Sequence, residues 1–352
     1  MNRVIVEGKP NGEFNASSKA RIDCLTILEN EGYQVLFVPS KYGVQTAKIR
    51  KPLQWLTYKK NLISWMHSLD AMNPGDRIII QYPLLNTTSG FSRFLVAAAK
   101  KGIQTVALIH DVDSLRFTKD NSSSRVVERV QFEDRELLPK FSTVISHNKK
   151  MSSYLKKIGC NNLIEIEAFD YLTEGATPEH ILSNGVTIAG NLSPEKAAYL
   201  KMLASINCRW RLYGAGYREM EANNIVYSGK LPPDILPLRM KGAFGLVWDG
   251  DSIDGCKGSF GNYLRYNNPH KLSLYIASGL PVIVWDESAE ADFVIKNRIG
   301  FTINTLSEIP AIMDGLSESE YSEMLDRVNK VRKKVTKGYF LRQALGYLDI
   351  NG

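Results

Sequence analysis

The chain has 352 residues, of which 44% are hydrophobic and 23% charged, and its formal net charge is +7. This composition is typical of a soluble globular protein and excludes collagen-like, disordered and disulfide-scaffold proteins. No apolar run reaches the ~18 residues that a membrane-spanning helix needs, and the N-terminus has no pattern of a secretory signal. Because the four cysteines are far apart in sequence, we expect neither a zinc site nor a disulfide framework; they are Cys24, Cys160, Cys208 and Cys256.

Short apolar strands alternate with amphipathic helices in the first half of the chain. This βαβα order predicts an α/β domain with a parallel, doubly wound sheet. The predicted strands are Val4–Val6, Gln34–Val38, Arg77–Tyr82, Thr105–His110, Thr143–Ser146 and Leu163–Glu167, and the predicted helices are 17–31, 53–69, 90–101, 124–139 and 149–158.

A polar, turn-rich stretch at 169–184 interrupts this pattern, which then restarts. We therefore predict an N-terminal Rossmann-like domain at 1–168, a linker at 169–184, a second such domain at 185–337, and a helix at 338–352 that returns to the first domain. Ligands bind at the carboxyl ends of such sheets, so we expect the two domains to face a central cleft. In the second domain the predicted strands are Val186–Ala189, Trp210–Tyr213, Ile225–Tyr227, Ala243–Trp248 and Pro281–Trp285, and the predicted helices are 194–205, His270–Ser278, 289–296 and 318–350.

The excess positive charge belongs to the first half of the chain. Residues 1–170 hold 24 Lys and Arg against 17 Asp and Glu, whereas residues 171–352 hold 20 of each. Within 32–69 there is no acidic residue, and Trp55, Tyr58 and Trp65 lie among the basic ones. Such a segment is typical of a docking face for an anionic membrane; the alternative is a solvated helix face with its aromatic residues in the core. The basic residues are Lys41, Lys48, Arg50, Lys51, Lys59 and Lys60.

A helix start near residue 270 is the sharpest candidate for a binding site. Asn268 is a good N-cap, Pro269 suits the first helical position, and Gly279 is a natural stop. Lys271 then lies in the first turn, where a cation is unfavourable for the helix itself. A bound anion resolves that conflict, which favours a diphosphate at this helix start. The alternative is a surface lysine beside an ordinary cap.

Other candidates follow strands. Gly190 and Asn191 end the first strand of the second domain, where backbone N–H groups are expected to face the cleft. The acid pairs 111–113 and 249–251 could hold a metal on a nucleotide diphosphate, act as a general base or bind hydroxyl groups, or simply form turns. His110, beside the first pair, is a second candidate for the base.

Several segments of the sequence resemble those of a known enzyme family. The stretch 244–300 (FGLVWDGDSIDGCKGSFGNYLRYNNPHKLSLYIASGLPVIVWDESAEADFVIKNRIG) is similar to the bacterial galactofuranosyltransferases of surface-polysaccharide (O-antigen and capsule) synthesis. IHDVDSLR, STVISHNKKMSSYL, FDYL and IAGNLS match the same family in the same order. The chain also resembles, more distantly, the glucosyltransferases that modify serine-rich bacterial adhesins. The resemblance implies the GT-B fold, with a UDP-sugar donor bound mostly by the second domain.

One departure from the GT-B pattern changes which residues are expected to bind the donor. Many retaining GT-B enzymes have two glutamates where this chain has Tyr266 and Leu274, so the usual glutamate contact to ribose is absent. We expect ribose binding from Asp249, Tyr263 or Asp292. The full set of expected donor-binding residues is Lys271, Asn268, His270, Gly190, Asn191, Asp249, Tyr263 and Asp292.

The expected reaction is an inverting transfer of galactofuranose from UDP-galactofuranose to a saccharide acceptor. Lys271 and its helix start are expected to stabilise the departing diphosphate, and Asp111 or Asp113 to act as the base. GT-B enzymes do not usually need a metal ion bound by a DxD motif, so we expect that no cofactor is required. Use of a divalent metal ion is left open as the alternative. Residues expected on the acceptor side are Gly8, Gly12, Glu13 and Arg116.

The basic first half fits an acceptor carried by a membrane lipid. The expected location is therefore cytoplasmic, at the inner face of the membrane, with no nucleic-acid partner and with homo-oligomerisation left open. Two alternatives remain at this stage. One is a UDP-glucose-dependent glucosyltransferase acting on a glycosylated adhesin. The other is a non-catalytic partner subunit of a glycosyltransferase.

Overall fold

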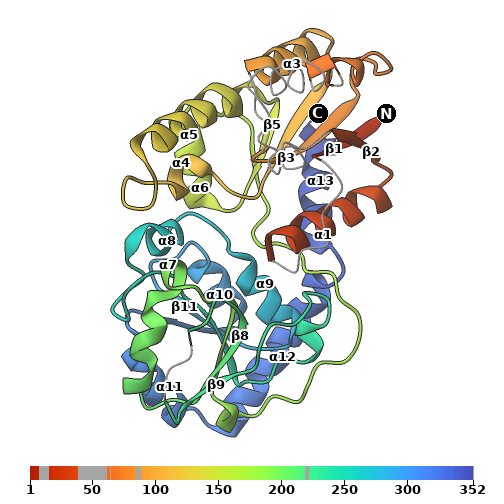
Figure 1. Cartoon of the computed structure of the whole chain (residues 1–352). Coiled ribbons are helices and arrows are strands. Elements are labelled where there is room, and N and C mark those ends of the chain that lie inside the picture. Colours follow the sequence, from red (N-terminus) through yellow and green to blue (C-terminus); the bar gives the residue numbers. More distant parts are fainter. Residues whose placement is uncertain (8–15, 39–61, 64, 85–88, 219–221, 352) are drawn as a thin grey trace. The chain divides into compact units, whose positions relative to one another are not determined.

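The computed structural model describes residues 1–7, 16–38, 62–63, 65–84, 89–218 and 222–351 (Figure 1). Packing divides the chain into two units. One unit comprises Met1–Glu13 and Cys24–Glu165, and the other comprises Phe14–Asp23 and Ile166–Gly352. The helix α1 (Ala16–Asn30) contributes its first part to the second unit and its remainder to the first.

The first unit contains a six-stranded parallel sheet in the order β2-β1-β3-β4-β5-β6. Because the strand order changes direction between β1 and β3, the switch point lies there. All six residues of β3 are buried, as expected of a central parallel strand. The strands are β1 (Asn2–Glu7), β2 (Gln34–Val38), β3 (Arg77–Tyr82), β4 (Gln104–Ile109), β5 (Thr143–Ser146) and β6 (Leu163–Glu165), and the helices are α3 (Ser89–Lys100), α4 (Asp113–Arg116), α5 (Ser124–Leu137) and α6 (Lys149–Lys157).

Trp65 lies in the core of the first unit. Its ring makes edge-on contacts with Phe91 and Phe94, each at 5.0 Å between ring centroids, and the side chain is buried. The prediction that Trp65 belongs to a membrane-docking face is therefore wrong, because its ring packs inward. Trp55 and Tyr58 lie outside the described residues.

The second unit contains another six-stranded parallel sheet, in the order β12-β11-β10-β7-β8-β9. This is the strand order of a dinucleotide-binding Rossmann sheet, and its switch point lies between β7 and β10. The strands are β7 (Val186–Asn191), β8 (Trp210–Ala215), β9 (Ile225–Tyr227), β10 (Phe244–Val247), β11 (Val282–Trp285) and β12 (Gly300–Ile303), and the helices are α7 (Pro194–Ala197), α8 (Gly258–Tyr263), α9 (His270–Ala277), α10 (Ala291–Asn297), α11 (Ile309–Gly315), α12 (Glu318–Val335) and α13 (Tyr339–Asn351).

Some second-unit elements differ from the sequence prediction. The predicted helix at 194–205 is α-helical only over α7 and continues as a 3-10 helix over Ala198–Ser205. The edge strand β12 and the helix α11 were not predicted. By its packing, α13 groups with the second unit. No described helix is both long and apolar enough to cross a membrane.

Candidate functional site

Lys271 and Asp249 form a buried ion pair at the carboxyl end of the second sheet. Asp249 follows β10, and Lys271 lies in the first turn of α9. The Lys271 ammonium nitrogen lies 2.7 Å from Asp249 Oδ1 and also donates to the backbone oxygen of Trp248 at 3.0 Å. Lys271 is 8% exposed and Asp249 3%. The carboxylate of Asp249 therefore supplies the negative charge that this helix start requires.

Gly190 and Lys196 complete this cluster at the switch point between β7 and β10. A Cβ atom at Gly190 would lie 3.4 Å from Lys271 Cε, so the end of β7 runs directly beside the lysine side chain. Lys196, in α7, has its ammonium nitrogen 3.5 Å from Asp249 Oδ2. Two lysines thus share one aspartate, and no pattern in the sequence points to Lys196.

The start of α9 differs by one residue from the prediction. Pro269, not Asn268, occupies the N-cap position, and no side chain caps the helix. The reason is that the Asn268 amide donates instead to the backbone oxygen of Glu167 at 2.8 Å. The Lys271 position in the first turn is unaffected by this correction.

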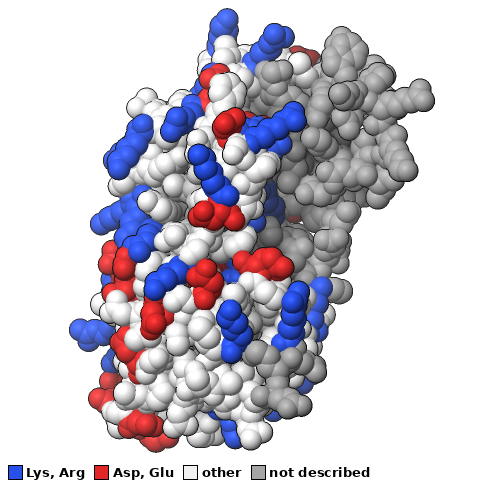
Figure 2. Space-filling view, turned by 60° about the vertical axis from the view of Figure 1, so that its left-hand side comes forward, with Lys and Arg blue, Asp and Glu red and all other residues white. Residues whose placement is uncertain are grey.

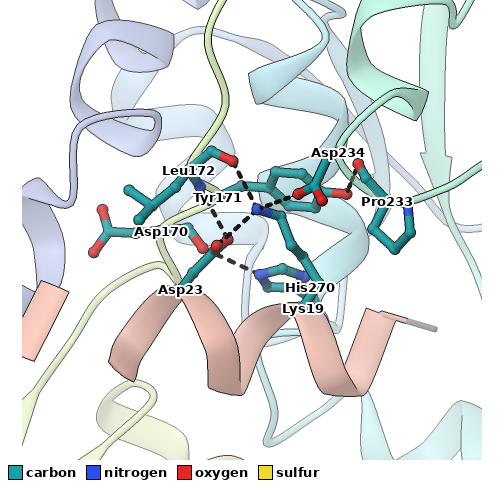
Figure 3. A network of polar contacts seen from close by, with 8 residues as sticks. All are labelled: Lys19, Asp23, Asp170, Tyr171, Leu172, Pro233, Asp234 and His270. Atoms are coloured by element: carbon teal, nitrogen blue, oxygen red, sulfur yellow. Dashed lines mark hydrogen bonds and ion pairs between the residues drawn. The ribbon is translucent and has the colours of Figure 1, made fainter. Parts of the chain in front are cut away.

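His270 lies in a polar network with the segment that precedes the second sheet (Figure 3). Its Nε2 atom is 3.1 Å from the backbone oxygen of Asp170, and its ring stacks on Tyr171 with 4.9 Å between centroids. Burial lowers the pKa of His270 to about 4, so the ring is neutral at physiological pH. These contacts show His270 holding the segment 170–171, and a donor contact from it stays a prediction.

The remaining residues that were predicted to bind the donor differ in their exposure. Asn191 ends β7, and its side-chain oxygen accepts from the backbone N–H of Ser193 at 2.9 Å. Tyr263 is buried at the end of α8, whereas Asp292 is exposed in the first turn of α10. Two residues before Asp292, Glu290 is 1% exposed, and no pattern in the sequence points to it.

In the first unit, the structure brings Asp111, Asp113 and Arg116 together after β4. A guanidinium nitrogen of Arg116 lies 3.0 Å from Asp111 Oδ2 and 3.9 Å from Asp113 Oδ1. Burial, and then the nearby Asp111, raises the pKa of Asp113 to about 6, although Arg116 opposes the shift. A carboxyl group with such a pKa can exchange a proton near neutral pH.

Two side chains, those of Asp134 and Gln81, fix residues of this region. Asp134, which is buried in α5, accepts from the Ser114 backbone N–H at 2.8 Å and from the Tyr82 hydroxyl at 2.5 Å, and so fixes the short helix α4. The Nε2 atom of His110 lies 2.7 Å from the Gln81 side-chain oxygen. His110 is therefore fixed beside the acid pair by a strand-end glutamine.

Several predictions fall outside the described residues. Gly8, Gly12 and Glu13, which were predicted on the acceptor side, lie outside the described residues. The six basic residues of the predicted membrane face also lie outside them. On the face in Figure 2, described side chains of both signs are interspersed. Within the described ranges, no three or more His, Cys, Asp or Glu side chains are grouped so as to hold a metal ion.

Comparisons with known sequences identify the family. The N-terminal domain model of the Glucosyltransferase 3-like family matches residues 3–167, and its C-terminal domain model matches residues 186–347. The chain is 31% identical over 338 residues to the beta-1,6-galactofuranosyltransferase WbbI of Escherichia coli K12, covering 94% of this chain and 93% of that protein. It is 25% identical to Glucosyltransferase 3 of Streptococcus parasanguinis, covering 78% and 79%.

Solved structures share the fold. Sucrose-phosphate synthase from Thermosynechococcus elongatus aligns with a TM-score of 0.67 at 11% identity, covering 99% of this chain and 98% of that chain. An alpha-glucosyltransferase in complex with UDP-glucose and DNA aligns with a TM-score of 0.57 at 13% identity, covering 99% and 98%. These neighbours have the GT-B fold predicted from sequence. The chain is therefore a glycosyltransferase that belongs to the Glucosyltransferase 3-like family, with two Rossmann-like α/β domains.

Proposed function

We propose that this glycosyltransferase moves galactofuranose from UDP-galactofuranose to a saccharide acceptor carried by a lipid, with inversion to a beta linkage. The similarity to a beta-1,6-galactofuranosyltransferase over 94% of the chain supports the choice of sugar. The observation that carries the donor assignment is the cluster of Lys271, Lys196 and Asp249 at the switch point of the second sheet.

The cluster suits a diphosphate because its two ammonium groups are paired with only one carboxylate, so positive charge is in excess. A diphosphate that enters this site competes with Asp249 for Lys271 and Lys196. The N–H groups at the start of α9 add further positive potential. Charge that develops on the departing UDP would then be stabilised by these groups, which is commonly the largest catalytic contribution. In this proposal the two lysines supply the positive charge, and transfer needs no divalent metal.

The first unit supplies the general base in this proposal, and Asp113 is favoured over Asp111. Asp111 is engaged by Arg116 at 3.0 Å, whereas Asp113 has the longer contact and a pKa of about 6. A base with a pKa near the working pH combines a useful ionised fraction with a favourable driving force for taking the acceptor hydroxyl's proton. The acceptor oxygen then attacks the anomeric carbon as the bond to UDP breaks.

A panel of UDP-sugars tests the proposal and separates it from its alternatives. UDP release is measured with UDP-galactofuranose, UDP-galactose and UDP-glucose, each with and without saccharide acceptors and with EDTA. We expect acceptor-dependent release from UDP-galactofuranose that EDTA does not abolish. Preference for UDP-glucose with a glycopeptide acceptor would support the adhesin glucosyltransferase instead. Absence of turnover with every donor would support a non-catalytic partner subunit.

A further inference from the structure

Glu290 is a buried acid that the donor site described above does not use. It precedes α10, in the connection that follows β11, and its backbone oxygen accepts the helix bond from Val294 at 3.0 Å. The side chain is 1% exposed, and within the described part of the chain neither carboxyl oxygen has a hydrogen-bond partner. Acidic side chains are rarely buried without a partner, because desolvation of the carboxyl group is then uncompensated.

Sheet topology places Glu290 at the same sheet edge as the cluster of Lys271, Lys196 and Asp249. Asp249 follows β10 and the connection that holds Glu290 follows β11, and these two strands pair in parallel with Val247 opposite Val284. After burial, the charges that act most on its carboxyl group are those of Lys271 and Asp249, and the net effect raises its pKa well above the usual value. Asp249 also acts on Tyr199, a fully buried residue whose hydroxyl lacks a hydrogen-bond partner among the described residues. Unsatisfied polar groups thus lie around the Lys271–Asp249 pair, at the edge where Rossmann sheets bind ligands.

The chemistry of Glu290 selects one part of a nucleotide sugar. A carboxyl group brings no positive charge to a phosphate, but its two oxygens can both bond to a pair of adjacent hydroxyl groups. Of the three sequence-derived candidates, Tyr263 has one oxygen and not two, Asp249 is already bonded to Lys271, and Asp292 is exposed.

We propose that Glu290 binds a vicinal diol of the donor, and this inference rests on the proposed function, in which a UDP-sugar occupies the Lys271 cluster. Both ribose and the transferred hexose carry such a diol. Binding satisfies both carboxyl oxygens at once. Glu290 is then a specificity residue that recognises the hydroxylated part of the donor, while the lysines recognise its phosphates.

The test compares three variants by calorimetry. Glu290→Met removes both oxygens at similar volume, and the fold should tolerate it because an unpartnered buried polar group is replaced by an apolar one. Glu290→Gln keeps hydrogen-bonding capacity. Lys296→Met is the matched control, an exposed position on the same helix. The ligands are UDP, 2′-deoxy-UDP and UDP-galactofuranose, with UDP-glucose as a second hexose donor.

We expect the wild-type protein and Lys296→Met to bind UDP about tenfold more tightly than 2′-deoxy-UDP, which is the effect of one good hydrogen bond. Glu290→Met should lose that preference, and Glu290→Gln should keep part of it. Loss instead of the preference for a UDP-hexose over UDP would assign the contact to the hexose. If Glu290→Met keeps both preferences, the inference is wrong. A wild-type protein that binds no UDP at all would contradict the proposed function itself.

Discussion

Lys271 is held in place by the carboxylate of Asp249. Its ammonium group lies against Asp249 Oδ1 and donates to the backbone oxygen of Trp248, so the lysine is both buried and paired. Removing one partner of a buried ion pair costs about 3–5 kcal/mol. A test of its role in binding must therefore keep the charge balance of the site.

The residue-scale prediction uses a paired substitution for that reason. Lys271→Met together with Asp249→Asn removes both charges of the ion pair and should preserve most of the fold. We expect UDP affinity to fall by about 10- to 100-fold, because charge-assisted hydrogen bonds to a phosphate are lost. Titration calorimetry measures the affinity, and thermal melting followed by circular dichroism verifies the fold.

Lys201→Met, an exposed lysine of the same unit, serves as the control and should bind UDP like the wild-type protein. Near-wild-type affinity in the paired variant would show that the diphosphate binds elsewhere.

At the scale of elements, one aspartate holds the start of the last helix. Asp170 Oδ1 accepts from the Phe340 backbone N–H at 3.1 Å, and Oδ2 accepts from that of Leu341 at 2.8 Å, both in the first turn of α13. Burial raises the pKa of Asp170 to about 7 against the effect of these bonds and of Arg342. Its backbone oxygen meanwhile contacts His270 (Figure 3). One residue therefore joins α13 to the start of α9.

The raised pKa of Asp170 predicts a pH-dependent stability. The folded state retains a proton that the unfolded state releases above about pH 4. The contribution of this group to stability is therefore fully present below about pH 4 and falls as pH rises to about 7. Asp170→Asn cannot ionise, so its stability relative to wild type should rise across this window. The upper limit of the rise is about 1.4 kcal/mol for each pKa unit.

Urea unfolding at pH 4, 5.5, 7 and 8 measures this difference. Below pH 4 the variant should be less stable by about 1 kcal/mol, because the amide NH2 of asparagine cannot accept the second backbone hydrogen bond. Glu323→Gln, at an exposed acid of α12, should show a nearly constant difference. A constant difference for Asp170→Asn as well would contradict the shifted pKa.

Strands were predicted more accurately than helix ends, for a physical reason. Buried parallel strands such as β3 (RIIIQY) read as continuous apolar runs and can be located within a residue or two. The edge strand β12 (GFTI) is short and mostly half-buried, so it has no such pattern. The cap of α9 was misplaced because Asn268 bonds to Glu167, a partner 101 residues away that local pattern cannot reveal.

Some residues of the candidate site could be predicted from the sequence, and others could not. The proximity of Gly190, Asp249 and Lys271 follows from topology, since residues after parallel strands meet at one sheet edge. Lys196 and Glu290 had no sequence signal. Lys196 reaches Asp249 across 53 residues of sequence, and Glu290 is distinguished only by burial without a partner. Both facts depend on tertiary packing.

At the scale of the whole molecule, the charge distribution separates the two halves of the chain. All of the net +7 lies in residues 1–170, and six basic residues without an acidic one lie within 32–69. Basic residues near an anionic bilayer contribute about 1 kcal/mol each, over a range of about 10 Å at 0.1 M salt. The basic half would therefore bring the enzyme to a lipid-linked acceptor, whereas the neutral half would bind donor from solution.

Charge reversal tests this prediction. Lys51, Lys59 and Lys60 are changed together to Glu, and co-sedimentation with liposomes containing about 30% anionic lipid is measured at 50 and 300 mM salt. The wild-type protein should sediment at low salt and be released at high salt, because salt screens the attraction. The variant should stay in solution at both salt concentrations.

The matched control reverses the charge of Lys201, Lys330 and Lys333, three exposed lysines of the neutral half, with the same change in net charge. If both triple variants lose binding equally, net charge alone is responsible, and if neither does, the basic segment has no part in membrane association.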